Sequence, residues 1–285
     1  PSSNLVAYLV SRVCRIPWVL DMRDPWTTNP FATQRGFPVL AKLERFLEGV
    51  VLQAADHVVV VSEQFLPPLL QTFPSLDRKK FNVIPNGYDP EDFEGIHAVR
   101  FDLFTIVHAG TFYGGRSATP FLEGLQHCIT LHPELRRTMQ VLFLGNAGSI
   151  TAATVAKLGL SDVVKLPGTL PHRVGLQYIV GADLLLLVPG PGKSTMTGKI
   201  FEYLAVKKPI LALAGEGAVK DLVLGAGLGT VVAPEDVHGI AAALHSLYCE
   251  FSNGGHRCFR ATDGILKQYD RREIARRMAA LFDTN

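Results

Sequence analysis

Residues 183–213, DLLLLVPGPGKSTMTGKIFEYLAVKKPILAL, decide the expected fold. They contain a continuous apolar run at 184–188, a glycine-rich turn, an amphipathic helical pattern from residue 199 and a second apolar run at 209–213. Short apolar runs that alternate with helices are typical of parallel strands buried on both faces of a sheet. This stretch therefore predicts a strand-helix-strand unit of a doubly wound α/β domain.

The same alternation extends on both sides of this stretch. From residue 102 onward we predict six strands, at 103–108, 140–145, 163–166, 183–188, 209–213 and 229–232. Earlier in the chain we predict three strands, at 17–22, 57–61 and 81–84, with helices at 5–13 and 37–54. The acidic, turn-rich stretch 88–99 is the expected linker. The chain is therefore expected to contain a partial Rossmann-like domain over residues 1–95 and a complete one over residues 96–285.

Composition excludes several classes of protein. The chain has 285 residues, of which 47% are hydrophobic and 19% charged, so it is neither disordered nor fibrous. A net charge of +2 does not favour nucleic acid as the partner. The four cysteines lack a CxxC pair, which predicts neither a zinc site nor a disulfide framework and favours the cytoplasm. The apolar runs are shorter than the ~20 residues that span a bilayer.

The beginning of the sequence is unusual. It starts Pro1-Ser2-Ser3, without Met or a signal peptide, and passes directly into a helical pattern. We interpret this as a start within the first domain. Because a βαβ unit takes roughly 30 residues, we expect on the order of 100 residues of that domain to be missing.

Three glycine-rich segments need separate interpretation. The turn Gly190–Thr195 imitates a phosphate-binding P-loop, but Leu187 stands where the first glycine is needed and Pro191 lacks an N–H. Gly225, Gly227 and Gly229 follow a helix and precede a strand, the reverse of the dinucleotide-binding order. Gly145–Gly148 follows a strand, where it is either an anion-binding loop or a tight turn.

Four segments together point to a known family. They are TGKIFEYLAVKKPIL at 197–211, VLDMRDPW at 19–26, VIPNGYDPEDF at 83–93 and HAGTFYGGR at 108–116. In order and interval they resemble the group 1 (GT4-like) retaining glycosyltransferases of GT-B fold, with an N-terminal truncation. The resemblance implies two Rossmann-like domains, the first one incomplete, with the last helix packing back on the first domain.

The resemblance also implies a reaction. A sugar would pass from a nucleotide-sugar donor, such as a UDP-, GDP- or dTDP-sugar, to an acceptor hydroxyl with retention, in polysaccharide biosynthesis, without a metal or other cofactor. The acceptor would be a glycan or a lipid-linked sugar, and no nucleic acid would take part. Two alternatives stay open: a nucleotide-binding GT-B fragment without transferase activity, and a Rossmann-like oxidoreductase, which the absence of GxGxxG after a strand disfavours.

The resemblance assigns donor-binding residues in the second domain. Glu202 would accept hydrogen bonds from the ribose, and its alternative is a surface glutamate at a helix N-terminus. The main chain of Thr169 and Leu170 would face the base, although residues 167–172 also suit a strand-helix turn. The phosphates would contact cations and backbone amides, which stabilise the negative charge that grows on the leaving group. Glycine lets the backbone approach the phosphates closely. The phosphate-binding residues would be Gly110, Thr111, Arg116, Thr197, Gly198 and Lys199.

The sequence departs from the family pattern at the donor site. Ser194 stands where many members have a second glutamate, and Thr111 stands where an arginine is frequent. Lys199 replaces a common proline and would supply the missing positive charge.

In the first domain, Arg23 and Asp24 follow a strand and are the candidate catalytic residues facing the acceptor. The alternative is a structural pairing of Arg23 with Asp21 or Asp24, and Trp26 is either an acceptor-stacking or a core side chain.

The last helix carries four arginines among apolar residues. They are Arg271, Arg272, Arg276 and Arg277. Such a helix can make a peripheral contact with the inner membrane face, but the pattern favours a solvated face on a helix that returns to the first domain.

Overall fold

The computed structural model of the chain describes residues 2–24, 26–28, 38–112, 116–190, 196–255 and 261–283. It forms two compact units, unit 1 with residues 1–86 and 271–285, and unit 2 with residues 87–270. The end of the chain therefore belongs to the first unit. Both units are α/β with parallel sheets, so the predicted fold class is confirmed.

Unit 1 has a three-stranded parallel sheet in the order β1-β2-β3. The strands are β1 (Val19–Met22), β2 (His57–Val60) and β3 (Phe81–Val83), and Val19 is in register with His57. The helices around them are α1 (Ser2–Cys14), α2 (Pro38–Ala54), η1 (Glu63–Phe65), α3 (Leu66–Thr72), η2 (Arg78–Lys80) and α12 (Arg271–Asp283). Pro67 and Pro68 lie in the first turn of α3, where proline is tolerated because no N–H is needed.

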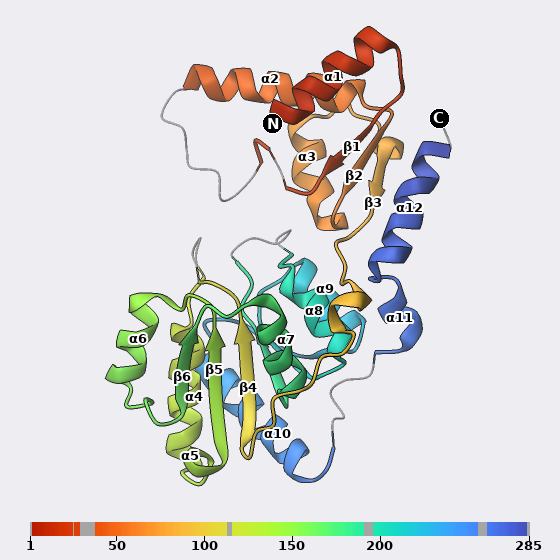
Figure 1. Ribbon diagram of the computed structural model, residues 1–285. Helices are drawn as coiled ribbons and strands as arrows, with labels where there is room; N and C mark the ends of the chain where they lie inside the picture. Colours follow the sequence, from red (N-terminus) through yellow and green to blue (C-terminus); the bar gives the residue numbers. More distant parts are fainter. Residues whose placement is uncertain are drawn as a thin grey trace. The chain divides into compact units, whose positions relative to one another are not determined.

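Helix α12 packs on the sheet of unit 1 beside β3 (Figure 1). Ile274, Met278 and Leu281 contact Val59 and Ile84. A guanidinium nitrogen of Arg277 donates to the Val83 carbonyl at 2.6 Å, which fixes the helix to the edge strand. The apolar face of this arginine-rich helix is therefore turned toward protein.

Unit 2 has a six-stranded parallel sheet in the order β6-β5-β4-β7-β8-β9. The strands are β4 (Phe104–Ala109), β5 (Met139–Leu144), β6 (Val164–Gly168), β7 (Leu184–Leu187), β8 (Ile210–Leu213) and β9 (Gly229–Val232). Every residue of β4, β7 and β8 is buried, as expected for parallel strands covered on both faces.

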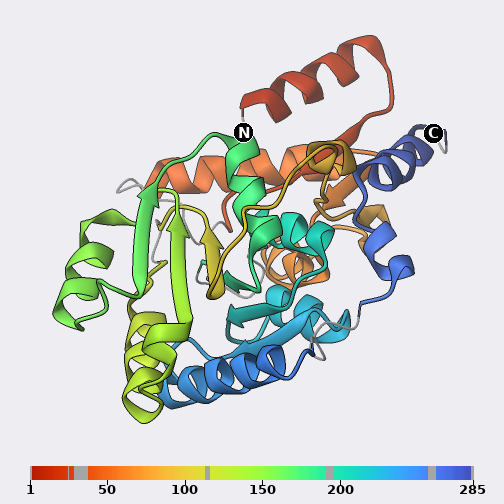
Figure 2. The ribbon, with the colours of Figure 1, turned by 60° about the horizontal axis from the view of Figure 1, so that its bottom comes forward.

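Helices cover both faces of this sheet. On one face lie α4 (Thr119–Leu131), α6 (Gly148–Lys157) and α10 (Val237–Ser252), and α10 runs alongside α4 (Figure 2). On the other lie α7 (His172–Gly181), α8 (Lys199–Val206), α9 (Ala218–Gly225) and α11 (Asp263–Lys267). The short α5 (Leu135–Thr138) precedes β5. This is the arrangement of a doubly wound domain.

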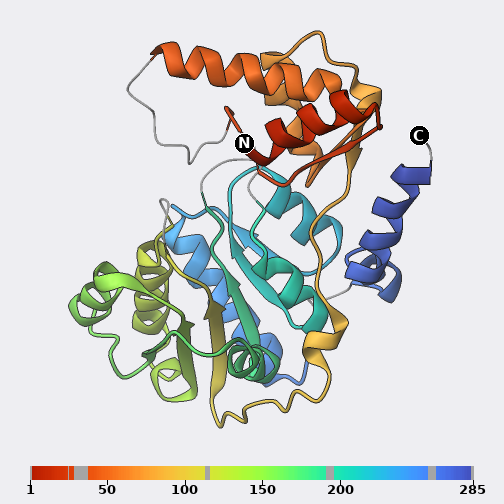
Figure 3. The same cartoon turned by 45° about the horizontal axis from the view of Figure 1, so that its top comes forward.

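The expected linker is part of unit 2. It contains η3 (Pro90–Phe93), and it runs along the unit before β4 (Figure 3). Tyr88, Phe93 and Ile96 pack on the apolar core of the unit, and the amide of Tyr88 donates to the Tyr269 carbonyl at 3.0 Å. Because these side chains need that core, the division between the units falls after residue 86, earlier than the expected boundary at 95.

Candidate functional site

In the sheet of unit 2, the order in which the strands are added reverses at β4, which has β5 on one side and β7 on the other. In open α/β sheets, ligands bind beyond the carboxyl ends of the strands at such a switch point. The segments that reach this edge include the one after β4, the loop after β6 and the first turn of α8. These are the segments predicted to bind the donor.

The loops after β4 and β5 are joined by backbone hydrogen bonds. The Gly110 amide donates to Leu144 O at 2.8 Å, and the Phe112 amide donates to Asn146 O at 3.2 Å. Gly145 has φ +107°, and a Cβ at this position would lie 2.5 Å from Gly110 O, so only glycine fits. The Gly110 amide, which we expected at the phosphates, is thus used within the fold. Thr111 lies between the two bonded amides, and residues 113–115 are outside the described part of the chain.

His108 lies beneath this loop at the end of β4. Its side chain is buried and stacks on Phe112, with ring centroids 4.6 Å apart, and its Nδ1 donates to Leu186 O at 3.0 Å. Burial, with a smaller contribution from the positive charges of Arg116 and Lys199, lowers the pKa of His108 from 6.5 to about 4, and the hydrogen bond to Leu186 O opposes this shift. The two predicted phosphate cations are therefore close enough to influence the same imidazole, which is neutral at neutral pH.

The first turn of α8 carries two of the predicted donor residues. Lys199 Nζ lies 2.8 Å from both carboxylate oxygens of Glu202, one turn further along the helix. The residue before the helix is Gly198, which has no side chain to cap it, and Thr197 is buried behind it. The positive end of the helix dipole at these residues favours an anion. Residues 191–195, with Ser194 and most of the P-loop-like turn, are outside the described residues.

The loop predicted to face the base ends next to Glu202. After Gly168, residues Thr169 and Leu170 lead to His172, the first residue of α7. His172 Nε2 lies 3.7 Å from Glu202 Oε1, so the predicted base and ribose regions adjoin. His172 ends the segment 167–172 that was predicted to face the base through its main chain, but its side chain was not among the predicted site residues. Its place at the start of a helix directly after that main chain was the signal that could have identified it.

Gly145–Gly148 forms a strand-to-helix turn. The Gly145 amide donates to Gly168 O at 2.8 Å, and the Gly148 amide donates to Asn146 Oδ1 at 3.0 Å. These amides are used inside the protein, which favours the turn over the anion-binding alternative.

In unit 1, Arg23 has a structural position. Its Nε lies 2.7 Å from a carboxylate oxygen of Asp21. Its Nη1 donates to Ile84 O at 3.3 Å, to Pro85 O at 3.4 Å and to Asn86 Oδ1 at 3.1 Å. The guanidinium thus joins the ends of β1 and β3, which fits the pairing alternative. Asp24 is exposed beside it, and Trp26 packs on the core of unit 1.

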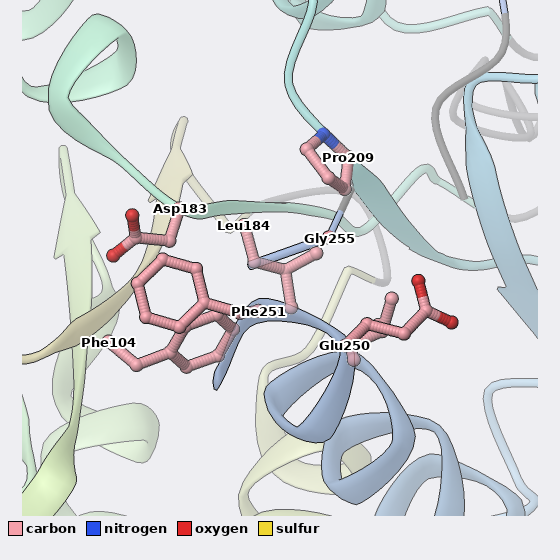
Figure 4. A pocket seen from close by; sticks show the side chains of 8 residues that line it. Phe104, Asp183, Leu184, Pro209, Glu250, Phe251 and Gly255 are labelled. Carbon is pink, nitrogen blue, oxygen red and sulfur yellow. The ribbon is translucent and has the colours of Figure 1, made fainter. Parts of the chain in front are cut away.

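Two cavities of unit 2 lie elsewhere. Figure 4 shows a small one of about 10 Å³, near the amino ends of β4, β7 and β8, where Phe104, Leu184 and Pro209 line it. It holds at most about one water molecule. A groove of about 550 Å³ lies over α4 and α10.

The described residues contain no group of three or more His, Cys, Asp or Glu side chains that could hold a metal ion. None of the helices in the described ranges is long and apolar enough to cross a membrane.

Comparison with protein families and structures shows what the chain is similar to. Residues 1–87 match the family model of the glycosyl transferase 4-like domain. Over 100% of the chain, the fold matches 77% of Anabaena HepE, solved in complex with UDP, with a TM-score of 0.76 and 16% identity. Sucrose-phosphate synthase from Thermosynechococcus elongatus matches with a TM-score of 0.69 and 17% identity, covering 99% of this chain and 71% of that one. A comparison with curated protein sequences finds no match.

A glycosyltransferase from Rickettsia africae has the same fold, with a TM-score of 0.70 and 13% identity over 99% of this chain and 80% of that one. At these identities the likeness establishes the fold, which is GT-B. The predicted resemblance to group 1 GT-B glycosyltransferases is thus confirmed by the family match in unit 1 and by the fold of the whole chain. The family match in unit 1 supports a transferase.

Proposed function

We propose that this chain transfers a sugar from a nucleoside diphosphate sugar to an acceptor hydroxyl, with retention of configuration at the anomeric carbon. The observation that carries the proposal is the grouping of Lys199, Glu202 and His172 at the switch point of a GT-B fold. It is supported by HepE, which has this fold and is solved with UDP and with UDP-glucose.

The diphosphate would bind between the loop after β4 and the start of α8. Lys199 and Arg116 supply positive charge, and Gly198 and Lys199 present backbone amides at the positive end of the helix. We also assign Gly110, Thr111 and Thr197 to the diphosphate, because they lie directly after β4 and directly before α8. Negative charge grows on the leaving phosphate as the glycosidic bond breaks, so these groups stabilise the transition state more than the ground state.

The nucleoside would bind at the adjoining edge. Glu202 accepts hydrogen bonds from the ribose hydroxyls, while the main chain of Thr169 and Leu170 faces the base. His172 lies between them, 3.7 Å from the Glu202 carboxylate, where its ring borders the ribose. A base read by main-chain atoms needs no diagnostic side chain.

In the reaction, the bond from the anomeric carbon to the diphosphate oxygen breaks and a bond to the acceptor oxygen forms. The acceptor hydroxyl loses its proton, which ends on the departing phosphate or in solvent. We propose that Lys199, Arg116 and the helix dipole neutralise the leaving group without a metal ion or other cofactor. Addition of EDTA should then leave the transfer rate unchanged.

The acceptor and location follow from the resemblance. We propose a glycan or lipid-linked acceptor in polysaccharide biosynthesis, and a cytoplasmic enzyme. Helix α12 is not proposed as a membrane contact, because Ile274, Met278 and Leu281 on its apolar face pack on unit 1. Any peripheral contact with a membrane would have to use another surface.

Calorimetric titration of the whole chain with UDP, GDP, dTDP, ATP and NAD tests the binding site. We expect a nucleoside diphosphate to bind, and Lys199→Ala and Glu202→Ala to weaken it by about tenfold each. Arg136→Ala is the matched control, because it removes an ion pair with Asp162, located before β5 and β6 at the opposite edge of the sheet. Unchanged affinity in both site variants would overturn the assignment.

Incubation with the sugar form of the bound nucleotide and a panel of acceptors tests transfer. NMR of the product reports the anomeric configuration. Binding without transfer to any acceptor would favour the alternative of a nucleotide-binding module, and preferential binding of NAD would favour an oxidoreductase.

A further inference from the structure

We propose that Tyr203 is a positioning residue of the donor site. Its phenol hydroxyl takes the place of a sheet hydrogen bond between β4 and β7, and so holds the carboxyl ends of these strands apart where the donor binds. The inference rests on the proposed function, because the segments it places are those proposed to bind the diphosphate.

The ladder between β4 and β7 is short. Its register pairs are Ile106 with Leu184 and Val107 with Leu185, in strands that are described throughout. On its other side β4 stays paired with β5 as far as Ala109 and Leu144. The strands β4 and β7 therefore separate two residues before β4 ends, at the switch point of the sheet.

The next bond of this ladder can be derived from the register. In a parallel pair, the bonds recur at every second residue, so the amide of Ala109 would donate to the carbonyl of Leu186. Instead, the amide of Ala109 donates to the Tyr203 hydroxyl at 2.9 Å, and that hydroxyl donates to Leu186 O at 3.3 Å. A hydroxyl oxygen both accepts and donates, so it can stand between the two backbone groups.

The site keeps this hydroxyl neutral and in place. The Tyr203 side chain is fully buried, and burial raises its pKa well above the usual range. His108 Nδ1 donates to the same carbonyl of Leu186 at 3.0 Å, which uses the second lone pair of that oxygen. The backbone groups freed by the separation of the strands are thus satisfied by side chains.

Tyr203 connects the two halves of the donor site. It lies on α8 directly after Glu202 and one turn after Lys199. Its partner Ala109 directly precedes Gly110 and Thr111 in the loop after β4. A shift of the phenol would therefore change the distance between the loop and the first turn of α8, which the two phosphates are proposed to bridge.

The variant Tyr203→Phe tests this role, because it keeps the ring and removes only the hydroxyl. Amide hydrogen exchange, resolved by NMR, should show faster exchange at Ala109, whose N–H loses its acceptor. Titration with UDP should show affinity weakened by about tenfold, since the loop is no longer held in the binding geometry. In assays of transfer, KM for the donor should rise more than kcat falls.

Two controls separate positioning from stability. Tyr248→Phe also removes a phenol hydroxyl, on a ring packed edge-on against Phe104 in the core on the other face of the sheet. Leu247→Ala lowers stability in that same core. Both controls should leave the UDP affinity and the Ala109 exchange rate near the wild-type values.

The outcomes distinguish this inference from the proposed function. Unchanged exchange at Ala109 in Tyr203→Phe overturns the inference whatever the ligand. Faster exchange with unchanged UDP affinity also overturns it, since the hydroxyl then only stabilises the sheet. If the wild-type chain binds no nucleoside diphosphate, the proposed function fails and the positioning role fails with it. Faster exchange at Ala109 together with weaker UDP binding, in Tyr203→Phe but not in the two control variants, supports both.

Discussion

The ammonium nitrogen of Lys199 lies 2.8 Å from both carboxylate oxygens of Glu202. The two residues are three positions apart in the first turn of α8, and their side chains are 33% and 22% exposed. Ion pairs at such exposure contribute little to stability. Here the pairing brings a cation and a hydrogen-bond acceptor to one point of the candidate site, where a nucleoside diphosphate needs the cation at its phosphates and the acceptor at its ribose.

Comparing UDP with pyrophosphate should separate these two roles. Lys199→Ala should lower the affinity for both ligands by about tenfold, because each ligand loses a charge-assisted contact. Glu202→Ala should lower the affinity for UDP by about tenfold. Its affinity for pyrophosphate should equal or exceed that of the wild-type chain, because pyrophosphate has no ribose and the Glu202 carboxylate no longer competes with it for Lys199. Calorimetry gives both affinities. An equal loss for both ligands in Glu202→Ala would mean that Glu202 acts only by placing Lys199.

The pKa of His108 predicts an acid-sensitive unit 2. It is lowered from 6.5 to about 4, so between these pH values the unfolded chain binds a proton that the folded one does not. Stability should therefore fall as the pH is lowered from 6.5 to 4, by at most about 3 kcal/mol from this residue. Urea unfolding across this range, followed by far-UV circular dichroism, measures the fall.

The variant His108→Asn should flatten this profile, because the amide can donate to Leu186 O but does not titrate. His97→Gln, at an exposed position, is the control. Both tryptophans, Trp18 and Trp26, belong to unit 1, so tryptophan fluorescence reports that unit separately. An acid-induced loss of the same size in His108→Asn would contradict the assignment.

Glu48 predicts the opposite pH dependence in unit 1. It is fully buried on α2, and Thr27 donates to its Oε2 through both amide and hydroxyl. Burial raises the pKa of Glu48 above 4.5, so the folded state holds the proton to higher pH and the contribution of this residue falls as pH rises. Glu48→Gln should therefore raise the free energy of unfolding at pH 7 by about 1 kcal/mol, with no difference near pH 4.

Removing the acceptor altogether should have the reverse effect. Glu48→Ala leaves the two donors of Thr27 without their partner, and should lower the free energy of unfolding by about 1–3 kcal/mol. Tryptophan fluorescence during urea unfolding measures both variants. A Glu48→Gln variant less stable than wild type at pH 7 would show that the ionised form is the favoured one.

Arg23 should matter for stability rather than for chemistry. Arg23→Ala removes the contacts with Ile84, Pro85 and Asn86 and should lower the stability of unit 1 by about 1–2 kcal/mol, while the transfer rate of the folded enzyme stays near that of wild type. Arg12→Ala, at an exposed position on α1, is the control. A large loss of kcat with unchanged stability would restore the catalytic role.

The secondary structure could be predicted closely from the sequence. Each predicted strand lies within two residues of its observed bounds, because short apolar runs between helical patterns have few other ways to be buried. The division between the units could not be placed as well. Turn residues at 88–99 indicate a linker, but Tyr88 and Phe93 pack on a core formed by residues far away in the chain.

The candidate site shows the same limit. The segments containing Gly110, Thr169 and Lys199 could be located, because each follows a strand whose carboxyl end must reach the same edge of a parallel sheet. The partners of single atoms could not be derived. The Gly110 amide donates to Leu144 O, and Arg23 donates to Ile84 O at the end of β3. His172, at the start of α7, lies close to Glu202 on α8.

By itself, the sequence determined the α/β class, the order of the elements and the edge of the sheet where a ligand would bind, because these follow from local patterns of burial and turns. Only the tertiary structure decided which groups are left for that ligand. Hydrogen bonds such as those of Tyr203 with Ala109 and Leu186 join residues from separate elements, and their geometry is fixed only when β4, β7 and α8 are packed together.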